Sequence, residues 1–223
     1  MGCRDISVIG DTHGCHHQLD LKPGDILIHT GDITAFGMEY EVLSFLDWFK
    51  NQPFRYKVFI GGNHDHYLEK NRGLVKKLLP ESVIYLENNT TVVDGIKIFG
   101  TPAGFYQNGG MAFNYRPGEE MERALEQMPY DLDILVTHVP PRGILDENRG
   151  CPQLLEKVNR IRPYLHLFGH IHEARGIYEG GGTRFCNAAL SDSPEFIQES
   201  GFHLKEKTPF QLNFSKCCCP GEG

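Results

Sequence analysis

The apolar residues of this chain gather in short runs that end at glycine or at polar residues. Five of these runs are rich in Val, Ile and Leu and predict buried strands: Asp5–Gly10, Asp25–Thr30, Tyr56–Ile60, Asp133–Thr137 and Tyr164–Phe168. Each run is followed within a few positions by Asp, Asn or His. Ligands bind at the carboxyl ends of strands in open α/β sheets. The pattern therefore predicts a metal centre at that edge, built from residues that follow these strands: Asp11, His13, Asp32, Asn63, His64, Asp65, His138, His170 and His172.

The remaining pattern alternates helical and extended segments. Apolar residues at helical spacing predict helices over Gly37–Lys50, Asn71–Leu79, Glu119–Met128 and Cys151–Ile161. Shorter strands are expected at Val83–Leu86, Thr91–Val93, Ile96–Phe99, Thr183–Asn187 and Phe210–Phe214. The segment Thr101–Pro117 has no clear period and is expected to be a loop that forms the substrate wall, with Phe105, Tyr106, Phe113 and Asn114 as candidates.

Several histidines and cysteines fall outside this ligand set. His29 and His166 lie inside predicted strands, ahead of the ligands, and are interpreted as structural. His16 and His17 follow His13 in a polar turn, where either substrate contact or simple solvation fits. Cys15 is either a reactive thiolate beside a cation or an inert thiol, and the inert thiol is favoured.

Composition narrows the class of protein further. The 223 residues fit one domain, expected at 1–214, with a short flexible tail at 215–223 that holds three consecutive cysteines. The net charge of −7 and the dispersed Lys and Arg residues argue against long nucleic acids as partners. Seven cysteines without a C-x-x-C pair indicate reduced thiols, and no apolar stretch approaches the ~20 residues of a membrane helix. We expect a cytoplasmic protein without a membrane anchor; its oligomeric state is left open.

The candidate ligands stand in a recognisable order. Asp11-x-His13, Gly31-Asp32, Gly61-Gly62-Asn63-His64-Asp65, His138 and Gly169-His170-x-His172 resemble the motifs of the calcineurin-like metallophosphoesterases. Ala112-Phe113-Asn114 and the run from Thr137 to Gly143 are similar to the metallophosphoesterase-domain-containing branch, which is similar to class III cyclic-nucleotide phosphodiesterases. The resemblance implies an α/β fold. Specifically, it implies a four-layer αββα sandwich of two mixed β-sheets flanked by helices, with a dimetal site at the carboxyl ends of the strands.

The resemblance also implies how two divalent ions would be held. The first would take Asp11, His13, Asp32 and His172, and the second Asp32, Asn63, His138 and His170. Alternation along the backbone would let the His-x-His step serve both ions. The mixed nitrogen and oxygen ligands suit Mn²⁺ as first candidate, with Fe, Zn and Mg as alternatives.

By the same resemblance, His64 would protonate or stabilise the leaving oxygen, and Asp65 would hold the His64 ring in its tautomer. Asn63, His64 and Asn114 are the candidate substrate-binding residues. The implied activity is a phosphodiesterase that hydrolyses small substrates such as cyclic nucleotides through a hydroxide bridging the two metals. A phosphomonoesterase, or a nucleotide-binding protein with weak residual catalysis, are the alternatives. Some relatives carry glycine at one metal histidine and are nearly inactive, so the presence of both His170 and His172 favours an active enzyme.

Overall fold

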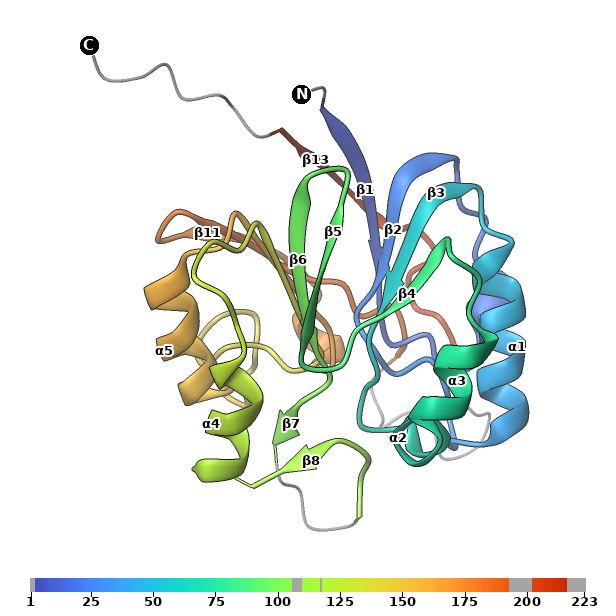
Figure 1. Cartoon of the computed structure of the whole chain (residues 1–223), viewed down its shortest axis with the longest axis horizontal. Helices are drawn as coiled ribbons and strands as arrows, with labels where there is room; N and C mark the ends of the chain where they lie inside the picture. Colours follow the sequence, from blue (N-terminus) through green and yellow to red (C-terminus); the bar gives the residue numbers. More distant parts are fainter. Residues whose placement is uncertain (1–2, 106–109, 117, 193–201, 216–223) are drawn as a thin grey trace.

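The chain folds into two β-sheets that pack face to face, with helices on their outer faces (Figure 1). The computed structural model describes residues 3–105, 110–116, 118–192 and 202–215. The first sheet has the strand order β13-β1-β2-β3-β4 and the second the order β11-β12-β10-β9-β6-β5. Inner strands pair in parallel, whereas the outer strands β13, β11 and β5 pair antiparallel, so both sheets are mixed.

The bounds of the elements follow the chain order. The first sheet contains β1 (Arg4–Ile9), β2 (Gly24–His29), β3 (Phe54–Phe59), β4 (Val83–Tyr85) and β13 (Phe210–Phe214). The second contains β5 (Asn89–Val93), β6 (Ile96–Thr101), β9 (Ile134–Thr137), β10 (Leu165–Phe168), β11 (Gly176–Gly180) and β12 (Thr183–Asn187). The helices are α1 (Glu39–Lys50), α2 (His66–Lys70), α3 (Arg72–Leu78), α4 (Glu119–Glu126) and α5 (Pro152–Ile161). A two-strand ladder joins β7 (Gly104–Phe105) to β8 (Asn114–Tyr115).

Strand alternation divides the core into three apolar layers. In β2, Ile26 and Ile28 point between the two sheets, where they join Ile134 and Val136 of β9 in one buried cluster. The neighbouring Leu27 points the other way, into the layer below α1. Since successive side chains of a strand face opposite sides, a strand buried on both faces reads as a continuous apolar run. This explains why the inner strands were visible in the sequence.

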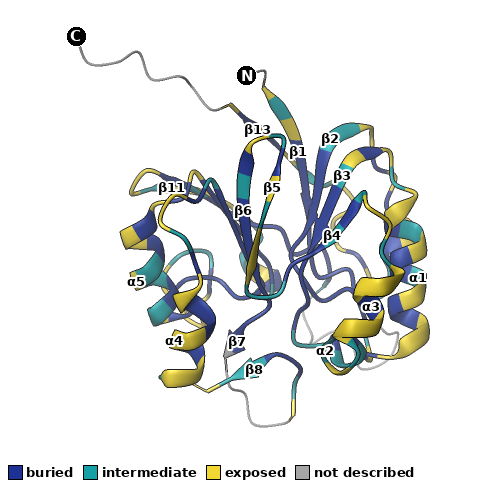
Figure 2. Cartoon of the chain, in the orientation of Figure 1, coloured by how far each residue is buried: buried dark blue, intermediate teal, exposed yellow. Residues whose placement is uncertain are grey.

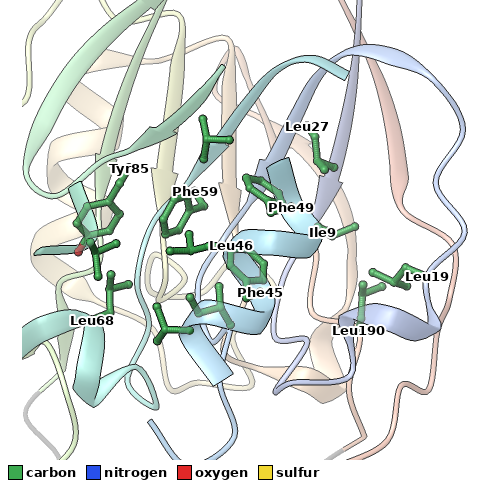
Figure 3. Packing of buried hydrophobic residues seen from close by; sticks show 14 of the residues in the cluster. Ile9, Leu19, Leu27, Phe45, Leu46, Phe49, Phe59, Leu68, Tyr85 and Leu190 are labelled. Carbon is green, nitrogen blue, oxygen red and sulfur yellow. The ribbon is translucent and has the colours of Figure 1, made fainter. Parts of the chain in front are cut away.

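The layer between the first sheet and its helices is rich in aromatic residues (Figure 3). Phe45 and Phe49 of α1 stack with ring centroids 4.9 Å apart, and both contact Phe59 of β3. Complete burial of each such side chain contributes roughly 1.5–3 kcal/mol. The buried stripe of α1 faces the sheet and its polar face remains exposed (Figure 2).

The second sheet is covered in the same way by the remaining two helices. Met121 and Leu125 of α4 and Leu154 of α5 form a buried cluster with Leu135 of β9. The order of layers is therefore helix, sheet, sheet, helix, and the expected αββα sandwich of two mixed sheets is confirmed.

The predicted helices and strands are present, with ends within two residues of those expected. Four helices and strands were not predicted: α2, β11, β7 and β8. The five residues of α2 are too few to show a helical period, and β11 is a largely exposed edge strand without apolar alternation. The short β7–β8 ladder lies in the segment expected to be an unstructured loop. Among the described residues, no helix combines the length and apolar character needed to cross a membrane.

Candidate metal centre

The predicted ligands converge at one edge of the sandwich, in the loops that follow five strands. Asp11 and His13 follow β1, Asp32 follows β2, and Asn63 follows β3. From the second sheet, the ligands are His138 after β9 and the pair His170 and His172 after β10. Six of the seven lie in three groups whose ligand atoms are within 4.8 Å of one another, and Asn63 joins through its side-chain oxygen.

One group joins Asp11, His13 and His172. The His172 Nε2 atom lies 3.3 Å from Asp11 Oδ1 and 3.4 Å from His13 Nε2. All three side chains are buried. Their ligand atoms thus gather around one buried point.

A second group joins Asn63, His138 and His170. Asn63 Oδ1 lies 2.8 Å from His138 Nε2 and 2.8 Å from His170 Nδ1. Asp32 stands between the two groups, because its Oδ2 atom lies 3.7 Å from His13 Nε2 and 3.4 Å from His138 Nε2. A single carboxylate oxygen therefore faces one histidine from each group.

The donor set fits a pair of divalent cations. Asp11 is fully buried, and its Oδ2 atom has no hydrogen-bond partner among the described residues. A buried, unpaired carboxylate oxygen is unfavourable unless a cation compensates it. Inward-facing imidazole nitrogens and carboxylate oxygens are also the ligands preferred by Mn, Fe and Zn.

Burial and neighbouring charges shift the pKa values of several histidines in this site. Burial lowers the pKa of His170 to about 3, and it also holds the pKa of His13 well below its usual value. Burial acts on His138 in the same sense, but the charge of Asp32 and the hydrogen bond to it prevail and raise that pKa to about 9. The negative charge of Asp32 therefore favours a positive charge at this place, which a bound cation could supply.

The backbone of the ligand loops is strained. Asp11, His13, Asp32 and His170 have φ angles of 50°, 42°, 55° and 69°, in the left-handed region that residues other than glycine rarely adopt. Each such residue costs on the order of 1–3 kcal/mol, and strain of this kind concentrates at functional sites. Glycines complete the loops: a Cβ atom at Gly169 would collide with Asp11 Oδ2, and one at Gly62 with Asp32 Oδ1.

The reason why His170 and His172 face different groups differs from the one expected. The sequence predicts that alternation along a strand sends the two side chains to different metals. The strand β10 ends at Phe168, however, and His172 begins a 3₁₀ turn (His172–Ala174). The two rings do face different groups, but the sharp turn at His170 directs them there, because pleated alternation no longer operates beyond the strand.

Backbone carbonyls orient three of the histidine rings. The Nδ1 atom of His13 donates to Thr34 O at 3.2 Å, that of His138 to Thr30 O at 3.0 Å, and that of His172 to Asp192 O at 2.6 Å. Each bond fixes the tautomer and leaves the Nε2 lone pair directed into the site.

His64 lies beside the first group. Its ring meets the His13 ring edge-on with centroids 4.7 Å apart, and its Nδ1 donates to Ala35 O at 2.9 Å.

The prediction that Asp65 holds the His64 ring is wrong. The Asp65 carboxylate accepts instead from Gly62 N at 2.8 Å and from Thr34 Oγ1 at 2.7 Å, as well as from backbone amides of the loop after β2. These bonds show that Asp65 fixes the loops rather than the imidazole. Burial and the nearby charge of Asp32 raise the Asp65 pKa to about 7.

Glu41 is a site residue that the sequence reading missed. Its buried carboxylate accepts hydrogen bonds from the backbone amides of Ala35, Phe36 and Met38 at 2.9–3.3 Å. It thereby fixes the segment whose carbonyls hold His13 and His64. A glutamate at the third position of a helix is a known capping signal and was available in the sequence. The carbonyl partners themselves carry no sequence signal, since every residue has one.

The expected substrate wall is partly wrong. Phe113 is buried in the core, where its ring lies against Gly61, and its backbone just before β8 is left-handed with a φ of 50°. Asn114 lines a hollow with Asn88 and Arg123, and none of the seven ligands lies in the lining of that hollow. Tyr106 and the Phe105 side chain lie outside the described residues.

Two further histidines lie inside strands. His29 and His166 are buried inside β2 and β10, as expected of structural residues, and burial lowers both pKa values to about 3.

The histidines and the cysteine that follow His13 differ in exposure. His17 is exposed, but His16 is buried against Trp48 and is not a solvated residue. Burial raises the pKa of Cys15, whose thiol donates to Phe202 O, and this agrees with the inert thiol. The tail cysteines 217–219 lie outside the described residues.

Comparison with known proteins agrees with this geometry. Residues 5–174 match the sequence profile of the calcineurin-like phosphoesterases. The chain is 34% identical over 224 residues to UPF0046 protein K07C11.7 of Caenorhabditis elegans, covering 91% of this chain and 76% of that protein. It is 35% identical over 213 residues to metallophosphoesterase domain-containing protein 1 of Homo sapiens, covering 82% of this chain and 64% of the human protein.

The chain thus matches less than two thirds of the length of the human relative. A solved structure, TT1561 of Thermus thermophilus, has the same fold. It superposes with a TM-score of 0.62 at 17% identity, covering 83% of this chain and 89% of that one.

Proposed function

This chain belongs to the calcineurin-like phosphoesterase family, and from that membership we propose that it is a dimetal-dependent phosphodiesterase for small substrates such as cyclic nucleotides. One observation carries the proposal: Asp32 Oδ2 faces a histidine of each ligand group. In the proposal, Asp32 is shared by both ions. Asp11, His13 and His172 complete the first set, and Asn63, His138 and His170 complete the second.

Bound as a pair, two such ions would clamp the attacking and leaving oxygens of a phosphate ester and acidify a bound water. The chain's own contribution is charge balance. Asp11 and Asp32 are the only carboxylates in the proposed ligand set, and the other five ligands are neutral side chains. Two dications would therefore leave a net positive site, which attracts a phosphate anion without an arginine clamp.

His64 is proposed as the acid that serves the leaving oxygen. Since Nδ1 donates to Ala35 O, that nitrogen carries a proton in either state of the ring. The Nε2 atom is then the one that exchanges a proton with substrate, and the Ala35 carbonyl stabilises the imidazolium form. His64 also lies near His13 and Asp32, so direct metal ligation is the competing role. Asn63 and Asn114 remain the other proposed substrate contacts.

Substrate size, the metal and the compartment are also part of the proposal. Dispersed basic residues and a net charge of −7 favour a small ester over a long polyanion. Mn²⁺ is the first candidate for both positions. Cys3, Cys15, Cys151 and Cys186 are free thiols, which fits a reducing compartment such as the cytoplasm.

The test is metal content measured together with turnover. The purified protein, loaded with Mn²⁺, is assayed on bis(p-nitrophenyl) phosphate, on p-nitrophenyl phosphate and on a panel of cyclic nucleotides, with Asp32→Asn as the control. We expect two ions per chain and faster turnover of diesters than of monoesters. Faster turnover of the monoester would indicate the phosphomonoesterase instead, and nucleotide binding without turnover would indicate a vestigial enzyme.

A further inference from the structure

A cavity of about 270 Å³ adjoins the metal centre on the side of α1. His13, a proposed metal ligand, forms part of its wall, together with His16, Phe36, Tyr40, Ser44 and Phe202. The loop after β2 and the amino end of α1 supply one side. Because His13 faces the metal centre through Nε2 and the cavity through its ring, a molecule with its phosphate at the metals could extend into the cavity.

Aromatic rings dominate the cavity. Phe202 stacks on His13 with ring centroids 3.9 Å apart and an interplanar angle of 11°. Phe36 and Tyr40 are 70% and 65% exposed although they are large aromatic residues. Rings with this exposure beside a functional site offer flat surfaces on which another ring can stack.

Among the described residues, the lining of the cavity contains no Lys or Arg. The one carboxylate among these lining residues, Glu41, is engaged on both oxygens by the amides of Ala35, Phe36 and Met38. A second phosphate or a carboxylate would lose its hydration there without gaining a cationic partner among the described lining residues. A neutral ring carries no charge and needs no such partner.

Hydrogen bonds fix the backbone on two sides of the cavity. Glu41 fixes the backbone of Ala35 and Phe36, and the Cys15 thiol donates to Phe202 O at 3.1 Å. A preorganised surface loses less entropy on binding than a mobile one.

We infer that this cavity is the subsite for a flat, neutral aromatic group carried by the phosphate ester, such as a nucleobase, which stacks on Phe36 and Tyr40. The inference rests on the proposed function for the placement of the phosphate and goes beyond it by naming the residues that select the organic group. It moves that role from the 101–117 segment to Phe36 in the loop that joins β2 to α1 and to Tyr40 in the first turn of α1.

Calorimetry on the Mn²⁺-loaded protein separates the two parts of such a ligand. Adenosine 5′-monophosphate and ribose 5-phosphate share the sugar phosphate, and only the first carries a base. We expect the base to improve the dissociation constant of the wild-type protein by about tenfold, as one stacking platform does. In Phe36→Ala/Tyr40→Ala this advantage should be lost while ribose 5-phosphate binds as before. Tyr40→Phe, which keeps the ring, should retain most of the advantage.

Tyr130→Ala is the matched control, since Tyr130 is also 70% exposed but lies beside Lys157 and outside the cavity lining. It should leave both dissociation constants unchanged. Equal affinity of the wild-type protein for the two ligands, or an equal loss of both in the double variant, would overturn the subsite. Binding is measured without turnover, so a protein that discriminates the base but hydrolyses no ester would contradict the phosphodiesterase proposal and leave the subsite standing.

Discussion

The two halves of the sandwich contribute different chemistry to the same site. The half built on β1–β4 supplies both carboxylates, Asp11 and Asp32, and the side-chain oxygen of Asn63, in addition to His13 and the neighbouring His64. The half built on β9 and β10 supplies His138, His170 and His172, and therefore only imidazoles. Negative charge among the candidate ligands is thus concentrated in the loops of one half. In the proposed metal centre, the other half would complete the coordination with neutral ligands.

The halves also differ in how their ligands are held. In the first, two buried carboxylates, Asp65 and Glu41, accept hydrogen bonds from five backbone amides of one loop, those of Ile33, Thr34, Ala35, Phe36 and Met38. In the second, the His138 ring depends on Thr30 O, which belongs to the first half. The first half therefore sets both charge and geometry, and damage to it should reach further than damage to the second.

Asp32→Asn should have the largest effect. The change keeps the shape of the side chain but removes the charge that faces His13 and His138 from 3.7 and 3.4 Å. We expect both ions to be lost and turnover to fall by several orders of magnitude. Plasma emission spectroscopy of the dialysed protein measures its metal content, and a diester assay measures its turnover. Retention of one ion at full occupancy would show that the carboxylate is not shared.

His170→Gly should be nearly as damaging to turnover but selective in metal loss. His170 faces Asn63 Oδ1 at 2.8 Å and lies outside the group of Asp11, His13 and His172. One ion should therefore remain bound while the other dissociates on dialysis, and circular dichroism should show an intact fold. Glycine also suits the left-handed backbone at this position, so the loss should not arise from strain. Near-native activity with both ions bound would exclude His170 as a ligand.

His64→Ala should separate chemistry from metal binding. If His64 is an acid and not a ligand, both ions should remain and turnover should fall by ~10²–10⁴. The loss should shrink for esters with acidic leaving groups such as p-nitrophenolate, which need little protonation. Asn63→Ala is the comparison variant, and it should lower occupancy of the second position. If the His64 variant loses metal as severely as the Asn63 variant, the competing role of His64 as a ligand is correct.

Glu41→Gln should give a smaller loss through the same histidine. The amide cannot accept on both sides from Ala35, Phe36 and Met38, so Ala35 O should no longer hold His64 in register. We expect a fall in kcat of ~10–100-fold, typical of groups that orient a functional residue, with little change in metal content. In a double-mutant cycle, the change should have little further effect on kcat once His64 is alanine. Equal effects in both backgrounds would show that Glu41 acts only on folding.

The sequence predicted the layers and the ligands because both leave local patterns. Strands buried on both faces appear as apolar runs, as in Ile134–Val136, and the polar residues that end them indicate a site. Seven candidate ligands, separated by as many as 161 positions, could be named because they follow such strands and because their order resembles the metallophosphoesterase motifs.

The sequence could not predict what depends on backbone direction. The pairing of His64 with Ala35 O instead of Asp65, and the inward turn of Phe113, are set by left-handed residues and carbonyl positions that any sequence could provide. Phe202 stacks on His13 from 189 positions away, and no local pattern near it marks that contact.

The smallest expected effect is on the free energy of unfolding. It concerns one buried histidine in each half, away from the proposed metal ligands. His29 and His166 are buried counterparts in β2 and β10, and each ring pairs with a threonine hydroxyl at 3.0 and 2.9 Å. His29 pairs with Thr12, between two ligands, whereas His166 pairs with Thr137 and can be changed with less damage to the site. Burial lowers the pKa of His166 to about 3, well below its unfolded value of about 6.5.

His166→Gln should therefore reveal a pH-dependent part of the stability. Below about pH 6.5 the unfolded chain binds a proton at His166 that the folded chain does not, so this contribution is present above that pH and is lost as the pH falls. Between about pH 8 and about pH 5 the loss from one such histidine is about 2 kcal/mol, and the glutamine variant lacks it. In urea titrations with chelator, the stability difference between wild type and variant should narrow by that amount, because all other titrating groups are shared. A constant difference for His166→Gln would mean that the buried ring titrates as it does in the unfolded chain.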